Sequence, residues 1–180
     1  MIEAIIAVDK NNGFAKNGTI PWKSKTDMTF FKNKTIGNVV IMGKNTYFSL
    51  PENQRPLKDR LNIVLTNNYK ELSNICNNII LKEGQTINSV FTNNMESFRY
   101  ILNNKENYKA LYYYLKNDFK IFVIGGKNIY EQYLPYYDKI WLTRFKTNYD
   151  CDKFLELNLD SYKENIYYDD DKLTIYEYYK

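Results

Sequence analysis

One aspartate in this chain stands where a carboxylate could do acid–base chemistry or bind a nitrogen-containing ring. Asp27 lies in the predicted helix over 24–35, on the same face as Phe31, and Trp22 comes just before this helix. These side chains could wall an apolar pocket in which the acid holds a ring nitrogen and an amino group. A structural interpretation competes, because Ser24 and Asp27 have the spacing of a capping box. The residues alone favour the structural interpretation.

Two strand–glycine–helix segments could hold the phosphates of a nucleotide. The apolar run over 121–124 is typical of a strand buried on both faces, and Gly125 and Gly126 break it before a helical pattern that ends at Pro135. A second unit joins the apolar stretch 38–42 to Gly43 and a short helical stretch. Glycine lets a phosphate approach the free amides that begin a helix. Each glycine turn could equally serve only to turn the chain, since the six-residue dinucleotide fingerprint is absent.

Composition narrows the chemistry further. The chain has 0 histidines, which removes Ser-His-Asp and Cys-His catalysis and His-ligated metal sites and favours a cofactor-driven reaction. Cys76 and Cys151 lack metal-type spacing and fit a reducing compartment. The dispersed net charge of +4 argues against nucleic-acid binding. Without a signal peptide or a membrane-spanning apolar run, we expect a cytoplasmic protein with no metal and no membrane partner.

The surrounding elements alternate between strands and helices. We expect strands over 2–8, 38–42, 61–65, 79–81, 89–92, 121–124, 139–145, 164–168 and 173–178, and helices over 24–35, 95–102, 108–115 and 127–134. A long polar loop over 9–19 could act as a lid. The alternation predicts one α/β domain over 1–180 with a mainly parallel sheet, flanking helices and an antiparallel C-terminal edge strand. Ligands bind beyond the carboxyl ends of such strands, where a ligand with two phosphate groups could bridge both glycine turns.

An ordered set of motifs resembles the dihydrofolate reductase family. The motifs are Ala-Val at 7–8, the stretch from Gly13 to Gly18, Ile-Pro-Trp at 20–22, Asp27 with Phe31, Val-Ile-Met-Gly-Lys-Asn-Thr at 40–46, Arg-Pro-Leu at 55–57 with Arg60, Ile-Gly-Gly-x-x-Ile-Tyr-Glu-Gln at 124–132 and Leu-Thr at 142–143. They span nearly the whole chain. The resemblance implies a single-domain dihydrofolate reductase-like fold with an eight-stranded sheet.

The activity implied by this resemblance is reduction of 7,8-dihydrofolate to tetrahydrofolate, with hydride transfer from NADPH to C6 and protonation at N5. Such an oxidoreductase would support one-carbon metabolism and thymidylate synthesis as a monomer, and antifolates would inhibit it. By position, Asp27 would bind the pterin and promote N5 protonation, Thr143 would bond beside it, Trp22 would order a water, and Tyr130 would lie against the nicotinamide. The residues implied for substrate binding are Ile5, Asp27, Met28, Phe31, Leu50, Arg55, Leu57, Arg60, Ile124 and Thr143.

Arg60 would pair with the glutamate carboxylate of the substrate, as a forked guanidinium does well. Thr66 and Asn67, with Lys44, would take the adenosine 2′-phosphate, because no acid stands there to repel it. The residues implied for NADPH binding are Ala7, Gly13, Phe14, Gly18, Thr19, Ile20, Gly43, Lys44, Asn45, Thr46, Leu65, Thr66, Asn67, Gly125, Gly126, Lys127, Asn128, Ile129 and Tyr130.

The chain departs from the family pattern at several positions. Ala15 replaces a common glycine in the loop over 9–19, Lys44 replaces a common arginine, and Leu155 stands where proline is common. The segment 84–118 contains an apparent helical insertion. Two other functions stay open at this stage: a reductase of the related riboflavin-pathway fold, and a folate- or nucleotide-binding relative without catalysis, whose Tyr-rich insertion would bind a partner.

Overall fold

A computed structural model describes residues 1–66, 89–92 and 96–180. It divides into two compact units, which we call unit 1 (Met1–Lys34 and Val123–Lys180) and unit 2 (Thr35–Phe122). Each is described by itself. The expected strand at 79–81, together with Asn67, Cys76 and Met95, lies outside the described residues.

Parallel strands form the centre of unit 1. Strand β1 (Ile2–Val8) runs parallel to β7 (Lys139–Phe145), with Ala7 opposite Thr143. Strand β6 (Ile121–Gly125), which begins in unit 2 and ends in unit 1, precedes β1 in the strand order. The apolar runs of these strands have few polar interruptions because both of their faces are buried.

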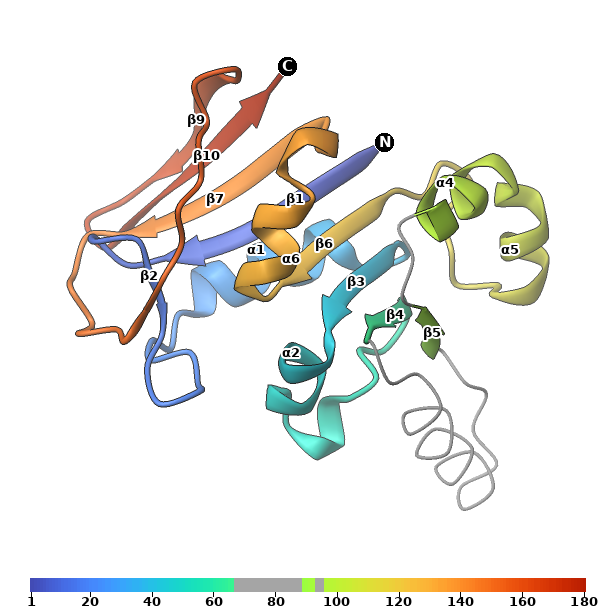
Figure 1. The fold of residues 1–180 in the computed structure, drawn as a ribbon, viewed down its shortest axis with the longest axis horizontal. Coiled ribbons are helices and arrows are strands. Elements are labelled where there is room, and N and C mark those ends of the chain that lie inside the picture. Colours follow the sequence, from blue (N-terminus) through green and yellow to red (C-terminus); the bar gives the residue numbers. More distant parts are fainter. Residues whose placement is uncertain (67–88, 93–95) are drawn as a thin grey trace. The chain divides into compact units, whose positions relative to one another are not determined.

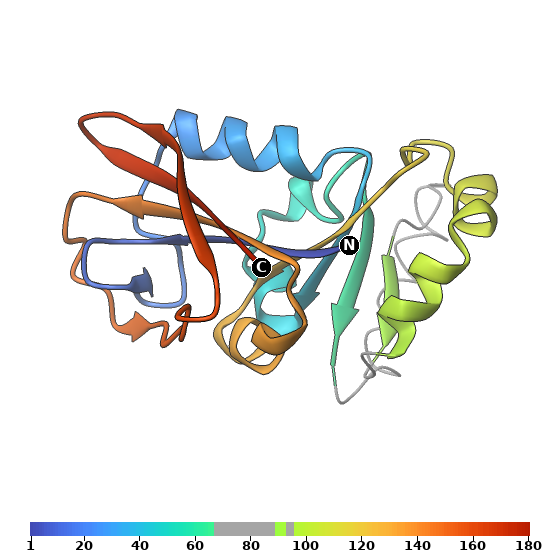
Figure 2. The ribbon, with the colours of Figure 1, turned by 90° about the horizontal axis from the view of Figure 1, so that it is seen from above.

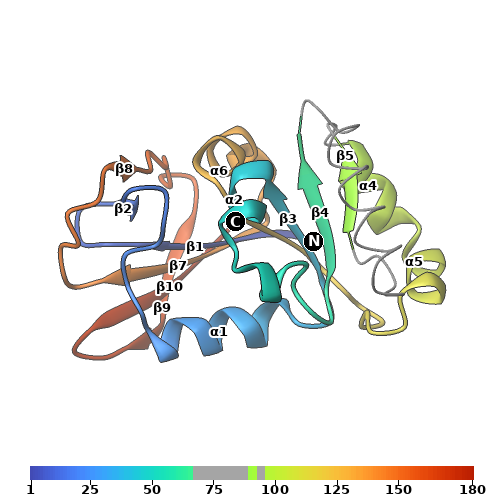
Figure 3. The same ribbon diagram turned by 90° about the horizontal axis from the view of Figure 1, so that it is seen from below.

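The C-terminal pair forms the predicted antiparallel edge of unit 1. Strand β10 (Leu173–Tyr179) is antiparallel both to β7 and to β9 (Lys163–Asp169), and β9 lies outermost (Figure 1). Helix α1 (Lys25–Thr35) lies on one side of these strands, and α6 (Lys127–Gln132) lies on the other (Figures 2 and 3). The ring of Phe30 in α1 packs 5.7 Å from the ring of Trp141 in β7. The sheet thus positions side chains from both helices.

The predicted loop over 9–19 contains a strand that the sequence analysis did not foresee. Strand β2 (Gly13–Ala15) pairs antiparallel with β8 (Lys153–Phe154) in a separate small sheet. Two or three residues are too few to show an alternating pattern, so only the tertiary structure reveals this pairing.

Unit 2 contains the rest of the parallel sheet. Strand β3 (Val39–Gly43) pairs with β4 (Leu61–Leu65), and β4 pairs with β5 (Ser89–Thr92). The helices of this unit are α2 (Lys44–Ser49), the 3₁₀ turn η1 (Glu52–Gln54), α4 (Glu96–Asn103) and α5 (Lys105–Leu111). Glycine at the end of β3 leads directly into α2, as predicted.

Two predicted helix ends are wrong. Helix α5 ends at Leu111, not at Leu115, because the chain turns after Tyr112, and Leu115 is buried in the turn that follows. Helix α6 ends at Gln132, and a separate 3₁₀ turn η2 (Leu134–Tyr136) carries Pro135. Both errors arose from extending an apolar periodicity beyond the residues that continue the helical hydrogen bonds.

The predicted fold class is confirmed. Among the described residues the main sheet has eight strands; the pairs β1–β7, β3–β4 and β4–β5 are parallel, and β10 is antiparallel to both of its neighbours. In the same part of the chain, no helix is both long and apolar enough to span a membrane. The single domain predicted over 1–180 stays a prediction.

Candidate active site

The carboxyl group of Asp27 and the hydroxyl of Thr143 are hydrogen-bonded in unit 1. Asp27 is half-buried in the first turn of α1, and Thr143 is buried on β7. Burial raises the pKa of Asp27, and the bond to Thr143 offsets part of that rise. The Ser24 hydroxyl accepts the Asp27 amide at 3.2 Å, so Ser24 caps the helix while the carboxyl serves another partner. The cap predicted for this sequence motif is confirmed on the side of Ser24, while the role of the Asp27 carboxyl toward a ligand stays a prediction.

A neutral tyrosine lies close to this acid. The hydroxyl of Tyr130 donates to the backbone carbonyl of Ile5 at 2.8 Å and is buried. Burial, and then the charge of Asp27, raise the pKa of Tyr130, so the phenol keeps its proton. Unit 1 thus brings together Asp27, Thr143, Tyr130 and Ile5, which the family resemblance had assigned to one site.

The predicted apolar walls are divided between buried and exposed side chains. Trp22 is buried, with its ring 4.8 Å from Phe145 and 5.5 Å from Tyr149. Phe31 is half-buried, whereas Met28 is 64 % exposed. Met28 therefore has much of its surface available for a ligand, while Trp22 is chiefly a packing residue in this structure.

The sequence analysis missed Asp9, which anchors the start of the loop over 9–19. Asp9 is 0 % exposed, and its carboxylate accepts the amides of Asn11 and Gly13, each at 2.8 Å, and the amide of Tyr149 at 3.1 Å. Burial acts to raise the pKa of Asp9, but these bonds and one from the Cys151 thiol outweigh it and lower the pKa. The sequence did contain a signal for this role of Asp9, which is an acidic residue at the boundary between a predicted strand and a long loop.

A second set of bonds ties this loop to the segment around β8. The Asp152 amide donates to Ala15 at 3.0 Å, and the Asp152 carboxylate accepts the Asn17 amide at 2.7 Å. The Leu155 amide donates to the carbonyl of Asn12 at 3.0 Å. A proline at position 155 could not make that bond, because proline has no amide hydrogen. The departure from the family pattern at Leu155 therefore adds a contact to the loop.

Within this loop, the residues predicted to border the nicotinamide differ in exposure. Gly13 is buried and Phe14 is half-buried, whereas Gly18, Thr19 and Ile20 are exposed. The exposed tip leaves these three residues open to a ligand. The buried base is fixed by Asp9.

The glycine turn of unit 1 has an unusual backbone. Gly125 has φ 134, a value that side chains rarely permit, and the Gly125–Gly126 peptide bond is cis. Helix α6 follows at once, with Lys127 in an ion pair with Glu131 at 3.6 Å. Of the predicted cofactor residues here, Asn128 is exposed and Ile129 is half-buried.

The predicted phosphate residues of unit 2 lie after its strands. Gly43 ends β3, and Lys44, Asn45 and Thr46 begin α2. Leu65 ends β4 with its side chain buried, and Thr66 follows it. The segments 43–46 and 65–66 contain a lysine, hydroxyls and amides but no Asp or Glu. These donors fit phosphate groups such as those of NADPH.

Other predicted substrate residues of unit 2 have defined partners. Arg55 is half-buried, and its Nη1 donates to the carbonyls of Phe48 at 2.9 Å and Leu50 at 3.1 Å. Leu57 is buried. Arg60 is buried too, and its Nη1 donates to the Thr35 hydroxyl at 3.0 Å. Arg55 thus supports the end of α2, which the sequence analysis did not foresee.

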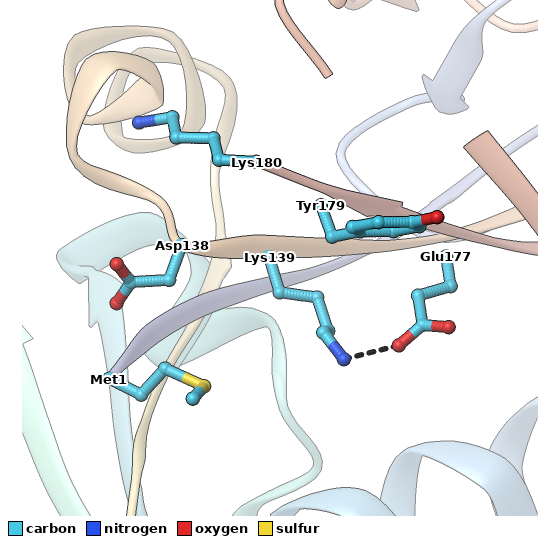
Figure 4. A pocket seen from close by; sticks show the side chains of 6 residues that line it. All are labelled: Met1, Asp138, Lys139, Glu177, Tyr179 and Lys180. Carbon is cyan, nitrogen blue, oxygen red and sulfur yellow. Dashed lines mark hydrogen bonds and ion pairs between the residues drawn. The ribbon is translucent and has the colours of Figure 1, made fainter. Parts of the chain in front are cut away.

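Two surface cavities lie away from these residues. One, of about 470 Å³, is lined by Met1, Asp138, Lys139, Glu177, Tyr179 and Lys180, with Lys139 paired to Glu177 (Figure 4). The other, of about 380 Å³, lies beside Phe30, Tyr167 and Ile175. Neither contains a residue predicted for catalysis or binding. In the described part of the chain, no group of His, Cys, Asp or Glu is arranged to hold a metal.

Comparison with known proteins agrees with this geometry. The family model described as dihydrofolate reductase matches residues 1–102 and 77–178. A dihydrofolate reductase of Drosophila melanogaster is 30% identical over 169 residues, which cover 89% of this chain and 81% of that protein. The viral dihydrofolate reductase of Saimiriine herpesvirus 2 (strain 488) is 31% identical over 178 residues, which cover 93% of this chain and 75% of that protein.

A solved structure shows the same fold. It is a dihydrofolate reductase from Enterococcus faecalis in complex with NADP(H) and RAB-propyl, with a TM-score of 0.71, 23% identity, and 99% of this chain and 95% of that chain covered. The fold and the relatives place this chain among the NADPH-dependent oxidoreductases of the α/β class. Within that class it belongs to the dihydrofolate reductase family.

Proposed function

We propose that this chain reduces 7,8-dihydrofolate to tetrahydrofolate with NADPH. The observation that carries the proposal is the half-buried carboxyl of Asp27, whose pKa is raised by burial and which is bonded to Thr143. A carboxyl in such surroundings holds a proton to a higher pH than an exposed aspartate does. This property suits an acid that must favour protonation of the pterin at N5.

The roles of the neighbouring residues follow from their contacts. Asp27 binds the amino group and ring nitrogen of the pterin and favours the protonated ring, with the proton delivered through a water beside Trp22. The backbones of Ile5 and Ile124 flank the pterin. Because Tyr130 is neutral and bonded to Ile5, it presents a ring without charge. NADPH, when bound, supplies the hydride, while the chain supplies orientation and a dry pocket.

Each unit has its own candidate phosphate donors. In unit 2 these are Lys44, Thr46 and Thr66, and in unit 1 they are the glycine turn and Lys127. The loop over 9–19, anchored by Asp9, closes over the nicotinamide and excludes water. We propose that the enzyme acts as a cytoplasmic monomer.

The test is NADPH oxidation followed by absorbance, with and without dihydrofolate. We expect oxidation that depends on dihydrofolate, is blocked by an antifolate, and is faster with NADPH than with NADH. Tight binding of both ligands without oxidation would overturn the proposal in favour of a non-catalytic binding protein.

A further inference from the structure

Asn62 is a buried polar residue within an apolar strand. Strand β4 reads Leu-Asn-Ile-Val-Leu, and Asn62 is 0 % exposed. Burying an amide is costly unless its hydrogen bonds are made, so the partners of Asn62 indicate its purpose. Its Oδ1 accepts the Leu57 amide at 2.8 Å, and its Nδ2 donates to the carbonyls of Leu57 and Arg60, each at 2.9 Å. One side chain thus holds both ends of the turn from Leu57 to Arg60.

The two middle carbonyls of this turn are held as well. The Lys58 carbonyl accepts Arg60 Nε at 2.9 Å, and the Asp59 carbonyl accepts the Gly37 amide at 2.9 Å. Asp59 has φ 56, in the left-handed region that residues other than glycine seldom adopt. Such a conformation persists only when its surroundings fix it. The turn therefore has a conformation that Asn62 sets from both ends.

Arg60 leaves the turn in a defined direction. Its Nη1 donates to the buried Thr35 hydroxyl at 3.0 Å, while its Nε contacts the turn itself. A guanidinium held in advance loses little conformational freedom when it binds a carboxylate. Any shift of the Arg60 backbone would misalign its fork. The carbonyl that Asn62 holds belongs to this same residue.

We propose that Asn62 is a positioning residue for recognition of the substrate's glutamate carboxylate, acting through Arg60. This inference rests on the proposed function, in which Arg60 pairs with that carboxylate. Asn62 sets how strongly the enzyme prefers dihydrofolate to a dihydropterin without the aminobenzoylglutamate tail. It has no part in hydride transfer, because the backbone groups that it bonds, in Leu57 and Arg60, lie in the turn.

The test compares two substrates in the full chain. One is dihydrofolate, and the other is a dihydropterin that carries a methyl group in place of the tail. We expect Asn62→Leu to raise the KM for dihydrofolate about tenfold or more, the loss typical of a misaligned bond to a charged group. The KM for the tail-less dihydropterin should change by less than about twofold. A purely structural role would raise both KM values together.

A double-mutant cycle assigns the effect to Arg60. Arg60→Leu should likewise raise the KM for dihydrofolate much more than the KM for the tail-less dihydropterin. Adding Asn62→Leu to Arg60→Leu should raise the KM for dihydrofolate further by less than about twofold. The proposal would be overturned if Asn62→Leu raised the KM for dihydrofolate as much in the Arg60→Leu variant as in the unaltered protein. Equal changes in KM for the two substrates would overturn it too.

Asn38→Leu is the matched control. Asn38 is also a buried asparagine in unit 2, but its side chain bonds the Ile36 carbonyl at 3.1 Å and the Lys120 amide at 2.9 Å. Its replacement should lower stability without changing the preference between substrates. If Asn62→Leu fails to fold, Asn62→Ser, whose hydroxyl can replace one bond, serves in its place.

Failure of the proposed function can be told apart from failure of this inference. If the unaltered chain binds dihydrofolate without oxidising NADPH, the same comparison is made on dissociation constants. If Asn62→Leu then weakened the binding of dihydrofolate much more than that of the tail-less dihydropterin, the inference would be supported although catalysis is absent. In an enzyme that does oxidise NADPH, equal changes in the two KM values on Asn62→Leu would overturn this inference and leave the proposed function standing.

Discussion

The thiol of Cys151 donates a hydrogen bond to the carboxylate of Asp9. Burial, followed by the charge of Asp9, raises the pKa of Cys151 to about 11, so the thiol keeps the proton that it donates. Together with three backbone amides, this bond satisfies the buried carboxylate of Asp9. Asp9 therefore joins the end of β1, the start of the loop over 9–19 and the segment after β7.

Asp9→Asn should destabilise the protein by about 1–3 kcal/mol at neutral pH, because the NH2 group of the new amide cannot accept a bond that the carboxylate oxygen in its place accepts. Since the pKa of Asp9 is lowered on folding, its contribution is present above the ordinary value of 3.8 and is lost as pH falls through the lower folded value. Urea denaturation from neutral to acidic pH should show the two proteins converging. Asp171→Asn in the exposed turn, as the control, should change stability by less than about 0.5 kcal/mol.

Gly13→Ala should strain the same region. A β-carbon at position 13 would lie 2.3 Å from the β-carbon and 2.7 Å from the sulfur of Cys151. We expect a loss of about 1–3 kcal/mol in the free energy of unfolding. Adding Cys151→Gly removes both atoms and should recover most of that loss, relative to Cys151→Gly alone. If the double variant were as unstable as the sum of the single changes, the contact would not be the cause.

Asp27→Asn should lower turnover at neutral pH by about a hundredfold or more, because it removes the acid proposed to favour N5 protonation. Titration of NADPH fluorescence should give a dissociation constant within about twofold of the unaltered protein, since the change leaves the phosphate donors in place. Unchanged turnover would contradict the role of Asp27.

The same substitution should raise stability at neutral pH. Folding raises the pKa of Asp27, so its carboxyl favours the folded state fully below the unfolded pKa, and this contribution is lost as pH rises through the folded pKa. Asp27→Asn removes the cost of keeping a charge in this half-buried position. Its stability advantage should therefore shrink as pH is lowered, as measured by denaturation at a series of pH values. An advantage that grew on acidification would show that the carboxyl is not destabilised by burial.

The long apolar strands and the glycines that end them could be predicted from the sequence. Strands β1 and β4 have the predicted bounds, because a run of apolar residues closed by polar ones has few alternatives in a parallel sheet. The half-buried acid was also predictable, since Asp27 interrupts an apolar helix face.

The anchoring residues were not predictable in the same way. Asp9 and Asn62 are polar residues at a strand boundary and within a strand, and their bonds reach Tyr149 and Leu57 through tertiary contacts. Position 62 carried a visible signal, an amide inside an apolar run, but the sequence does not say which backbone groups it serves. The pairing of β2 with β8 depends equally on distant residues.

Leu155 gives this protein a built-in reporter. Its amide hydrogen is bonded to the carbonyl of Asn12, so deuterium from the solvent can replace it only when that bond opens. The exchange rate at this position therefore follows opening of the loop over 9–19 in the unlabelled, unaltered protein. A chain with proline at this position would have no such hydrogen to exchange. In this chain, a single backbone position makes the motion of the loop directly observable.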